Sequence, residues 1–326
     1  MGVIMDNDTS QVFTARPEIT MKMTLTPEQY SSIKEWSEII PTLYMLDICV
    51  VSATKLTEES LEKQPRKANL VTKLRNLDRP NNGFSYLCAL MEKVSDSRGK
   101  LSFDELKNQI LADISALKSF FKEARVIEEN DFVIAFLKDL MGDPIEIKRE
   151  EYLTFLKKLN NHFKLQNPVS PKQRLDKAKE IILEANTLNI SVHHIITTIT
   201  LACLYGNKST KKLMKFKTDP NKFDAENALA DILLIPRFAK LKLEMEQLGR
   251  NGVGYQRVNF ITDDNALNEL LKFFKPKVVK HKDKADGRES ELTMTVEFGK
   301  LLEEATEDEY NELLLLLDKS HSKLDH

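Results

Sequence analysis

Acidic side chains accompany two apolar, β-branched stretches of the sequence. Asp47 lies inside the run YMLDICVVS, while Asp263 and Asp264 directly follow the run VNFIT. A buried carboxylate is costly unless it is paired or binds a metal, so Asp47 requires a partner. Because ligands of α/β proteins bind at the carboxyl ends of parallel strands, we expect these two acidic positions to meet in space.

A third acidic segment, DAENALADILLI, precedes the second of these stretches. Asp231 lies four residues after Asn227 and two helical turns after Asp224, so the three share nearly one helix face. Converging carboxylates repel each other unless a divalent cation lies among them, and oxygen ligands without His or Cys suit Mg²⁺ or Mn²⁺. The sequence therefore predicts a magnesium or manganese site formed by Asp47, Asp224, Asp231, Asp263 and Asp264.

A basic segment, NKSTKKLMKFK, occupies residues 207–217. Four of its lysines fall on one side of a helix at spacings of three and four: Lys208, Lys211, Lys212 and Lys215. Such a row is able to bind the phosphate backbone of RNA. The alternative is a solvated helix end at which lysines are favoured by the helix dipole. The sequence leaves both interpretations open.

The elements that position these residues are predicted from apolar periodicity and capping signals. Residues 43–51 and 258–262 are predicted to be buried strands. An irregular arm at 1–25 precedes a helix that opens at Thr26-Pro27. Most of 56–190 is predicted to be helical, with starts at Ser102 and at Ser170-Pro171 and with loops at 75–85 and 164–171. Further helices are expected over 191–217 and 223–248.

The C-terminal part is predicted to be less regular. The glycine-rich stretch at 249–254 reads as a turn, 275–279 as a short edge strand, and 280–291 as a polar linker. Thr306 then opens a capped helix with an apolar face. Because five leucines in a row leave apolar surface on more than one side, this helix is expected to dock on the fold or to contact a protein partner or a second subunit.

Composition indicates a packed, soluble, globular protein, because 41% of its 326 residues are hydrophobic and 30% are charged. The net charge of −2 does not mark a nucleic-acid binder. Its three cysteines are scattered and fit neither a zinc pattern nor a disulfide framework, so a reducing cytoplasm is expected. No apolar run reaches the roughly 18 residues of a membrane span, and no secretory signal is present, so no membrane partner is expected.

In their order along the chain, these segments resemble the motifs of PIN-domain ribonucleases, the family of many toxin–antitoxin toxins. YMLDICVVS resembles the first strand of that family, and FITDDNAL resembles its fourth motif. ISVHHIITTITLACLYGNKST is similar to the second motif, through Ile190-Ser191, Leu204-Tyr205-Gly206 and Ser209. DAENALADILLI occupies the place of the third, acidic motif.

The resemblance implies a PIN-like, Rossmannoid α/β/α domain with a short parallel sheet. The core would comprise residues 26–55 and 190–280, interrupted by a large helical insertion at 56–189 and followed by a linker and C-terminal helix at 281–326. It also implies a metal-dependent ribonuclease that hydrolyses RNA phosphodiesters with Mg²⁺- or Mn²⁺-activated water, for example as a toxin or defence effector. Asp47, Asp231 and Asp264 would be its catalytic residues, with Asp224 as the alternative to Asp231 on the same helix.

The second motif departs from the family pattern, because Cys203 stands at the position of a metal-binding Glu and a thiol suits a hard cation poorly. Glu180 or Glu184 is a candidate replacement, although a like-charged pair on an exposed helix face is the alternative. A second function is therefore a catalytically degenerate PIN-like scaffold that binds a protein partner through its helices. A third is a mostly helical interaction protein without an α/β core, in which the two strands do not pair.

Overall fold

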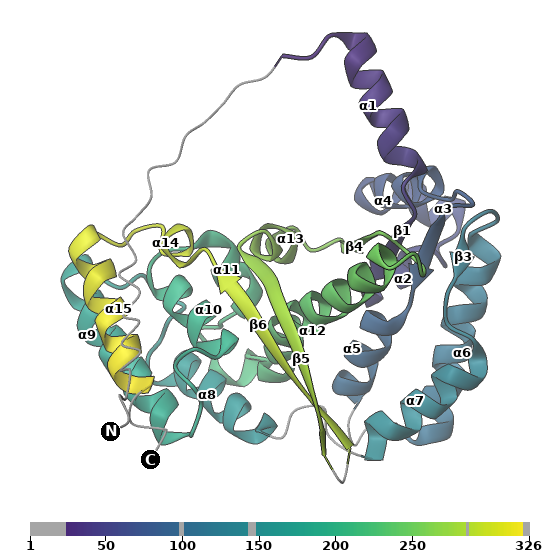
Figure 1. Ribbon diagram of the computed structural model, residues 1–326. Coiled ribbons are helices and arrows are strands. Elements are labelled where there is room, and N and C mark those ends of the chain that lie inside the picture. Colours follow the sequence, from purple (N-terminus) through teal and green to yellow (C-terminus); the bar gives the residue numbers. More distant parts are fainter. Residues whose placement is uncertain (1–23, 98–100, 143–147, 285–286, 322–326) are drawn as a thin grey trace, which may run out of the picture. The chain divides into compact units, whose positions relative to one another are not determined.

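A computed structural model describes residues 24–97, 101–142, 148–284 and 287–321 (Figure 1). The chain divides into two compact units, residues 1–39 and 40–326. The first unit contains helix α1 (Pro27–Ile39), which has no buried residue. Thr26 and Gln29 cap this helix reciprocally, as the sequence predicted. Most of the predicted N-terminal arm lies outside the described residues.

The second unit is built on a four-stranded parallel sheet with the strand order β3-β2-β1-β4. Its strands are β1 (Thr42–Leu46), β2 (Asn82–Ser85), β3 (Arg125–Val126) and β4 (Arg257–Ile261). The central strand β1 pairs with β2 and β4, so that Met45 aligns with Ser85 on one side and Phe260 on the other. The predicted α/β class is confirmed at this level, and the fully helical alternative is wrong because β1 and β4 pair.

Each face of the sheet is covered by its own hydrophobic core. Side chains alternate along β1, as strand geometry requires. Leu43 and Met45 belong to one buried cluster, whereas Leu46 belongs to the other. The first cluster also contains Ile232, from the helix before β4, and the second contains Leu74, from a helix between β1 and β2. Burial on both faces explains why β1 is a continuous apolar run.

Helices connect these strands (Figure 1). Between β1 and β2 lie α2 (Ile48–Ala53), α3 (Glu58–Glu62) and α4 (Pro65–Asn76), and between β2 and β3 lie α5 (Leu87–Ser97) and α6 (Phe103–Phe120). Between β3 and β4 lie α7 (Asn130–Gly142), α8 (Arg149–Asn161), α9 (Pro171–Thr187), α10 (Ile195–Leu204), α11 (Lys208–Met214), the 3-10 turn η1 (Pro220–Lys222) and α12 (Ala225–Arg250). None of the described helices combines the length and apolar composition needed to cross a membrane.

The prediction of a strand over 43–51 is wrong beyond Leu46. Asp47 is the N-cap of α2, and its carboxylate accepts a hydrogen bond from the backbone N–H of Cys49 at 3.5 Å. The β-branched residues that follow are therefore helical, because a capping Asp at the strand end starts a helix despite their β propensity.

The predicted insertion at 56–189, mostly helical and separate from the sheet, is also corrected, because β2 and β3 belong to the same sheet as β1. The stretch around β2 was predicted as a loop on account of its asparagines and glycine. Gly83 is required in this strand by a close approach, since a Cβ atom there would lie 2.2 Å from the Tyr255 hydroxyl oxygen. A glycine that usually indicates a turn here makes room for an aromatic ring.

The predicted helix over 191–217 is two helices, α10 and α11, which are separated at Gly206. This residue has a φ of +89°, a conformation that glycine adopts without strain. The predicted helix over 223–248 is confirmed as α12, and Asp224 caps it as expected. The Ser102 capping box is likewise present at the start of α6.

The region after β4 is more regular than predicted. Helix α13 (Asn265–Leu271) is followed by β5 (Phe274–Lys284) and β6 (Gly287–Val296), which pair as an antiparallel hairpin. The prediction of a polar linker over 280–291, at the start of the 281–326 segment, is therefore wrong. Helices α14 (Phe298–Leu301) and α15 (Glu307–His321) complete the described chain, and Thr306 caps α15 as predicted.

Candidate functional site

Asp47 lies at the carboxyl end of β1, where only 5% of the residue is exposed. Its backbone N–H donates to the carbonyl oxygen of Ile261 at 3.1 Å, which ties it to β4. The hydroxyl of Thr262 donates to the Oδ2 atom of Asp47. The buried carboxylate thus has partners from its own helix and from the neighbouring strand, as burial demands.

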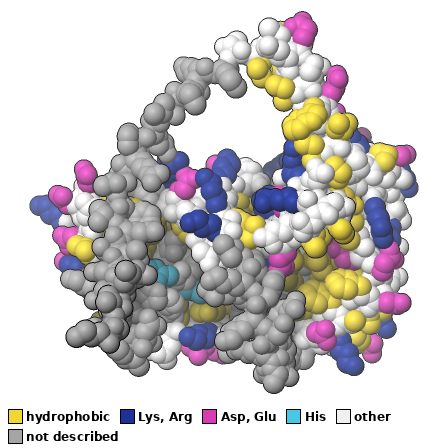
Figure 2. Space-filling view, in the orientation of Figure 1, with side chains coloured by type: hydrophobic (Ala, Val, Ile, Leu, Met, Phe, Trp, Pro, Cys, Tyr) yellow, Lys and Arg dark blue, Asp and Glu magenta, His cyan; other side chains and the backbone are white. Residues whose placement is uncertain are grey.

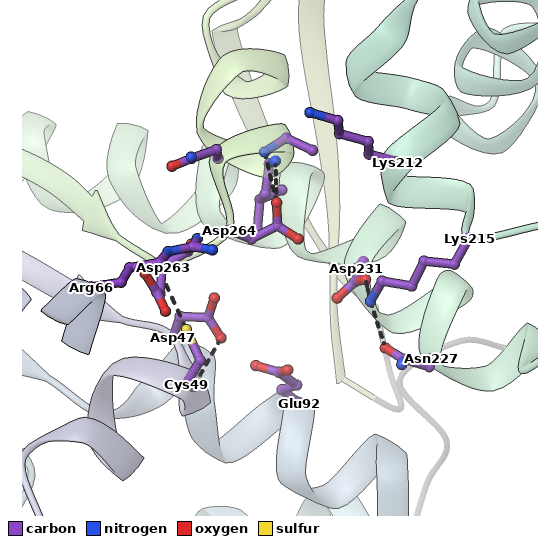
Figure 3. A pocket seen from close by; sticks show the side chains of 13 residues that line it. Asp47, Cys49, Arg66, Glu92, Lys212, Lys215, Asn227, Asp231, Asp263 and Asp264 are labelled. Atoms are coloured by element: carbon purple, nitrogen blue, oxygen red, sulfur yellow. Dashed lines mark hydrogen bonds and ion pairs between the residues drawn. The ribbon is translucent and has the colours of Figure 1, made fainter. Parts of the chain in front are cut away.

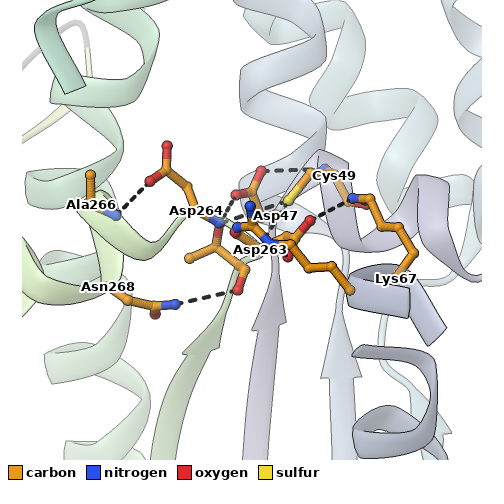
Figure 4. A network of polar contacts seen from close by, with 9 residues as sticks. Asp47, Cys49, Lys67, Asp263, Asp264, Ala266 and Asn268 are labelled. Atoms are coloured by element: carbon orange, nitrogen blue, oxygen red, sulfur yellow. Dashed lines mark hydrogen bonds and ion pairs between the residues drawn. The ribbon is translucent and has the colours of Figure 1, made fainter. Parts of the chain in front are cut away.

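Asp264 follows β4 and caps α13. Its Oδ1 atom accepts from the backbone N–H groups of Ala266, at 2.7 Å, and Leu267, at 3.2 Å. The backbone N–H of Asp264 donates to the Thr262 hydroxyl oxygen at 2.9 Å, so one threonine contacts both acidic residues (Figure 4). Since both cap bonds use Oδ1, the Oδ2 atom of Asp264 does not take part in the cap.

A pocket with a volume of about 460 Å³ opens at these strand ends (Figure 3). Carboxylates from four separate segments line it, among them Asp47, Glu92, Asp231 and Asp264. Glu92 comes from α5, and its Oε2 atom accepts from the backbone N–H of Ile48 at 3.4 Å. The remaining lining residues are Cys49, Arg66, Lys212, Lys215, Asn227, Asp263, Asn265, Ala266 and Leu267.

Asp231, on α12, carries the clearest electrostatic signature of this pocket. Its pKa is raised overall from 3.8 to about 6: burial is the largest cause, the carboxylates of Asp264 and Asp47 act in the same direction, and Lys215 opposes the shift. The Lys215 Nζ atom lies 2.5 Å from Oδ2 of Asp231. The carboxylates are therefore close enough to repel one another, and a lysine partly neutralises them.

Asp263 also lines the pocket, but its carboxylate is already paired. Oδ1 lies 2.7 Å from Nε of Arg66, and Oδ2 lies 2.9 Å from Nζ of Lys67. The backbone N–H of Asp263 donates to the sulfur of Cys49 at 3.3 Å. Burial, followed by the charge of Asp47, raises the pKa of the Cys49 thiol to about 12, so this cysteine is protonated and inert at neutral pH.

The donors fit a hard divalent cation in their chemistry but do not form a ready-made cage. Within the described residues, no group of three or more His, Cys, Asp or Glu side chains is placed to hold a metal ion. Mg²⁺ usually keeps several waters and takes only one or two protein carboxylates together with substrate phosphates. One or two protein carboxylates are therefore enough, and the pocket offers oxygen donors from Asp47, Glu92, Asp231 and Asp264.

The structure brings together most of the acids that the sequence singled out. Asp47, Asp231, Asp263 and Asp264 all line the pocket. Asp224 does not line it, and its carboxylate instead accepts from the backbone N–H of Asn227 at 3.0 Å as the cap of α12. Asn227, four residues before Asp231, faces the pocket in its place.

The predicted basic row is divided by the structure. Lys212 and Lys215 line the pocket, whereas Lys208 and Lys211 do not. Lysine and arginine side chains are interspersed with aspartate and glutamate over the face in Figure 2. Within the pocket, Lys212 and Lys215 place positive charge beside the carboxylates.

No protein-family model, curated protein or solved structure matches this chain. The PIN resemblance therefore stays a prediction from the quoted motifs. Cys203, which stands at the position of the second-motif glutamate, does not line the pocket, and neither do the candidate replacements Glu180 and Glu184. Cys203 is buried in the core, with 1% exposed, while Glu184 pairs with Lys158 at 2.6 Å and Glu180 with Lys177 at 3.7 Å.

Glu92 and Arg66 are functional pocket residues that sequence reasoning missed. The signal was present: β2 ends at Ser85, and Glu92 follows two turns along the helix after it. Because β2 was predicted as a loop, the helix after it was not recognised as one that begins at the carboxyl end of a strand.

Proposed function

We propose that this chain is a metal-dependent ribonuclease of PIN type, which hydrolyses RNA phosphodiesters with the help of Mg²⁺ or Mn²⁺. One observation carries the proposal: carboxylates from four separate segments line a single pocket at the carboxyl ends of parallel strands. Ligand sites of α/β folds occur at this edge of the sheet. A role as a toxin or defence effector remains a prediction of the resemblance alone.

Glu92 takes, in this proposal, the role that the resemblance gives to the second-motif glutamate. Its carboxylate lies in the same pocket as Asp47, Asp231 and Asp264, whereas Cys203 is buried in α10. The catalytic set is therefore Asp47, Glu92, Asp231 and Asp264, and the departure at Cys203 no longer implies loss of a ligand.

A bound divalent cation would supply a water of lowered pKa and neutralise phosphate charge. The protein's contribution is to fix the oxygens in place. Asp47 is held by Thr262 and the start of α2, and Asp264 is held by two backbone N–H groups of α13. Lys212 and Lys215 add positive charge on one side of the pocket, where a phosphate backbone would lie.

The second candidate is a catalytically degenerate scaffold that binds a protein partner through its helices. The ion pair between Lys215 and Asp231 favours it, because an ammonium group already neutralises one of the four acids. The lack of a preformed three-residue metal group among the described residues points the same way. The two candidates differ in whether RNA is cut when Mn²⁺ is supplied.

Cleavage of a fluorescent single-stranded RNA in Mn²⁺ or in EDTA separates them. We expect the parent to cut only with Mn²⁺, and Glu92→Gln to lose at least about 10-fold in rate. Glu180→Gln is the matched control, because Glu180 lies on the exposed side of α9 outside the pocket. A parent that does not cut, or a Glu92→Gln variant that cuts as fast as the parent, overturns the nuclease.

A further inference from the structure

Two cations occupy the first turn of α4, where helix electrostatics disfavours them. Arg66 and Lys67 are the second and third residues of this helix, and its first turn contains no acidic residue. Helix N-termini carry partial positive charge and favour Asp and Glu instead. Basic residues at this position therefore call for another partner.

That partner is Asp263, in the loop after β4. Its Oδ1 atom lies 2.7 Å from Nε of Arg66, its carbonyl oxygen accepts from the Arg66 Nη2 group, and its Oδ2 atom lies 2.9 Å from Lys67. The Arg66 side chain is nevertheless 62% exposed, whereas that of Asp263 is 17% exposed. Asp263 thus anchors one edge of a mostly exposed guanidinium group that lines the pocket and carries five N–H donors in all.

A second cation, Lys212, lies on the opposite side of the same pocket. Figure 3 shows Arg66 and Lys212 at its two sides, with Asp264 and Asp47 between them. Lys215, next to Lys212, is already paired with Asp231. The pocket therefore has carboxylates at its centre and an exposed cation at each side, which matches a chain of phosphates crossing it.

We propose that Arg66 binds a backbone phosphate of single-stranded RNA and that Lys212 binds another phosphate on the other side of the carboxylates. In this arrangement Asp263 positions Arg66 and does not hold a metal. A planar guanidinium binds phosphate through two parallel N–H bonds, which a lysine does not reproduce. The substrate class rests on the proposed function, whereas the roles of Arg66 and Asp263 go beyond it.

Fluorescence anisotropy of a labelled single-stranded RNA, measured in EDTA over a series of salt concentrations, tests this assignment without cleavage. We expect Arg66→Ala and Lys212→Ala each to weaken binding and to reduce the slope of log affinity against log salt by about 0.7. Arg66→Lys keeps the slope but binds more weakly than the parent. Arg75→Ala is the control on the same helix, because Arg75 pairs with Glu58 and does not line the pocket.

The positioning role of Asp263 is tested by a double-mutant cycle with the same binding readout. If Asp263 acts through Arg66, Arg66→Ala costs less affinity in an Asp263→Asn background than in the parent. An equal loss in both backgrounds contradicts the positioning role. A purely structural effect of Asp263 would produce the same equal loss.

The outcomes separate this inference from the proposed nuclease. A parent that does not bind the RNA in EDTA, or an Arg66→Ala variant that behaves like Arg75→Ala, overturns the phosphate site even if the parent cuts RNA with Mn²⁺. Binding that depends on Arg66 in a protein that never cuts RNA upholds the phosphate site and contradicts the nuclease.

Discussion

The Thr262 hydroxyl donates a hydrogen bond to the carboxylate of Asp47, joining residues 215 positions apart in the sequence. The same oxygen accepts from the backbone N–H of Asp264. One side chain therefore links the acid after β1 to the acid after β4. This link answers how a carboxylate is tolerated in an apolar region, because Asp47 is buried but hydrogen-bonded.

Thr262→Val removes this hydroxyl while nearly preserving side-chain shape. We expect a loss of about 1–3 kcal/mol in the free energy of unfolding, because the buried Asp47 carboxylate loses a donor. Urea unfolding at neutral pH measures it. Thr72→Val is the control, since Thr72 is exposed on α4 and its hydroxyl donates only to Ala68 at 2.9 Å. Equal stability of Thr262→Val and the parent would contradict the role given to this bond.

Asp264 and Asp224 form a matched pair, because both cap helices but only Asp264 lines the pocket. Asn is as good a cap as Asp, so neither Asp→Asn change should affect folding. We expect Asp264→Asn and Asp47→Asn to abolish RNA cleavage, while Asp224→Asn cuts like the parent. Cleavage assays with circular dichroism as a folding check decide this, and undiminished cleavage by both pocket variants would refute the nuclease.

Asp231 should make the protein less stable as pH rises from about 4 to about 6. Burial, with the charges of Asp264 and Asp47, raises its pKa from 3.8 to about 6, so the native state holds the proton more tightly than the unfolded state. At about 1.4 kcal/mol per pKa unit, Asp231→Asn should gain up to roughly 3 kcal/mol at pH 7.

This gain should vanish below pH 3.8, where Asp231 is protonated in both states. Denaturant unfolding of parent and variant across this range provides the test, with Asp224→Asn as the variant that shows no such gain. A pH-independent difference between Asp231→Asn and the parent would rule out titration of Asp231 as its source.

Asp113, on α6, should show the opposite pH dependence. Burial raises the pKa of its carboxyl. Hydrogen bonds outweigh this effect and lower the pKa overall; they come from Lys55 and Lys93, both at 2.6 Å, and from Tyr86, at 2.7 Å. Its stabilisation is present above the unfolded pKa of 3.8 and is lost as pH falls through the lower folded value.

Asp113→Ala is accordingly expected to cost about 3 kcal/mol at pH 7, because two lysines lose a shared buried anion. Asp176→Ala, at an exposed position on α9, should change stability by less than about 0.5 kcal/mol. Chemical denaturation of the two variants compares them, and a similar small loss in both would mean that the buried network contributes little.

The sequence predicted the residues of the site better than it predicted the fold around them. Asp47 was predicted inside one strand and Asp264 just after the other, the rule that carboxyl ends of parallel strands meet brought them together, and both line the pocket. That reasoning worked because β1 is buried on both faces and so reads as a continuous apolar segment, and because β4 still contributes Val258 and Ile261 to the cores on the two faces. Asp224 was a less secure choice, since helix spacing does not say which of two acids on one side faces a cavity.

Short-range signals failed where a distant contact decides the structure. β2 has only four residues and contains Gly83, which is needed because Tyr255 packs against it from far along the chain. Missing that strand hid the helix that carries Glu92. The part of the β5–β6 hairpin after the predicted edge strand at 275–279 was likewise read as a linker, since its polar composition conceals strand pairing.

Thermal melting with and without Mn²⁺ tests the central claim most directly, namely that Asp47, Glu92, Asp231 and Asp264 together bind a divalent cation. A ligand bound only to the native state raises the melting temperature, with about 2.7 kcal/mol of stabilisation at 100 times its dissociation constant. We predict that Mn²⁺ stabilises the parent and Asp224→Asn but does not stabilise the double variant Asp47→Asn with Asp264→Asn. An unchanged melting temperature for the parent, or an equal rise in the double variant, would contradict the account.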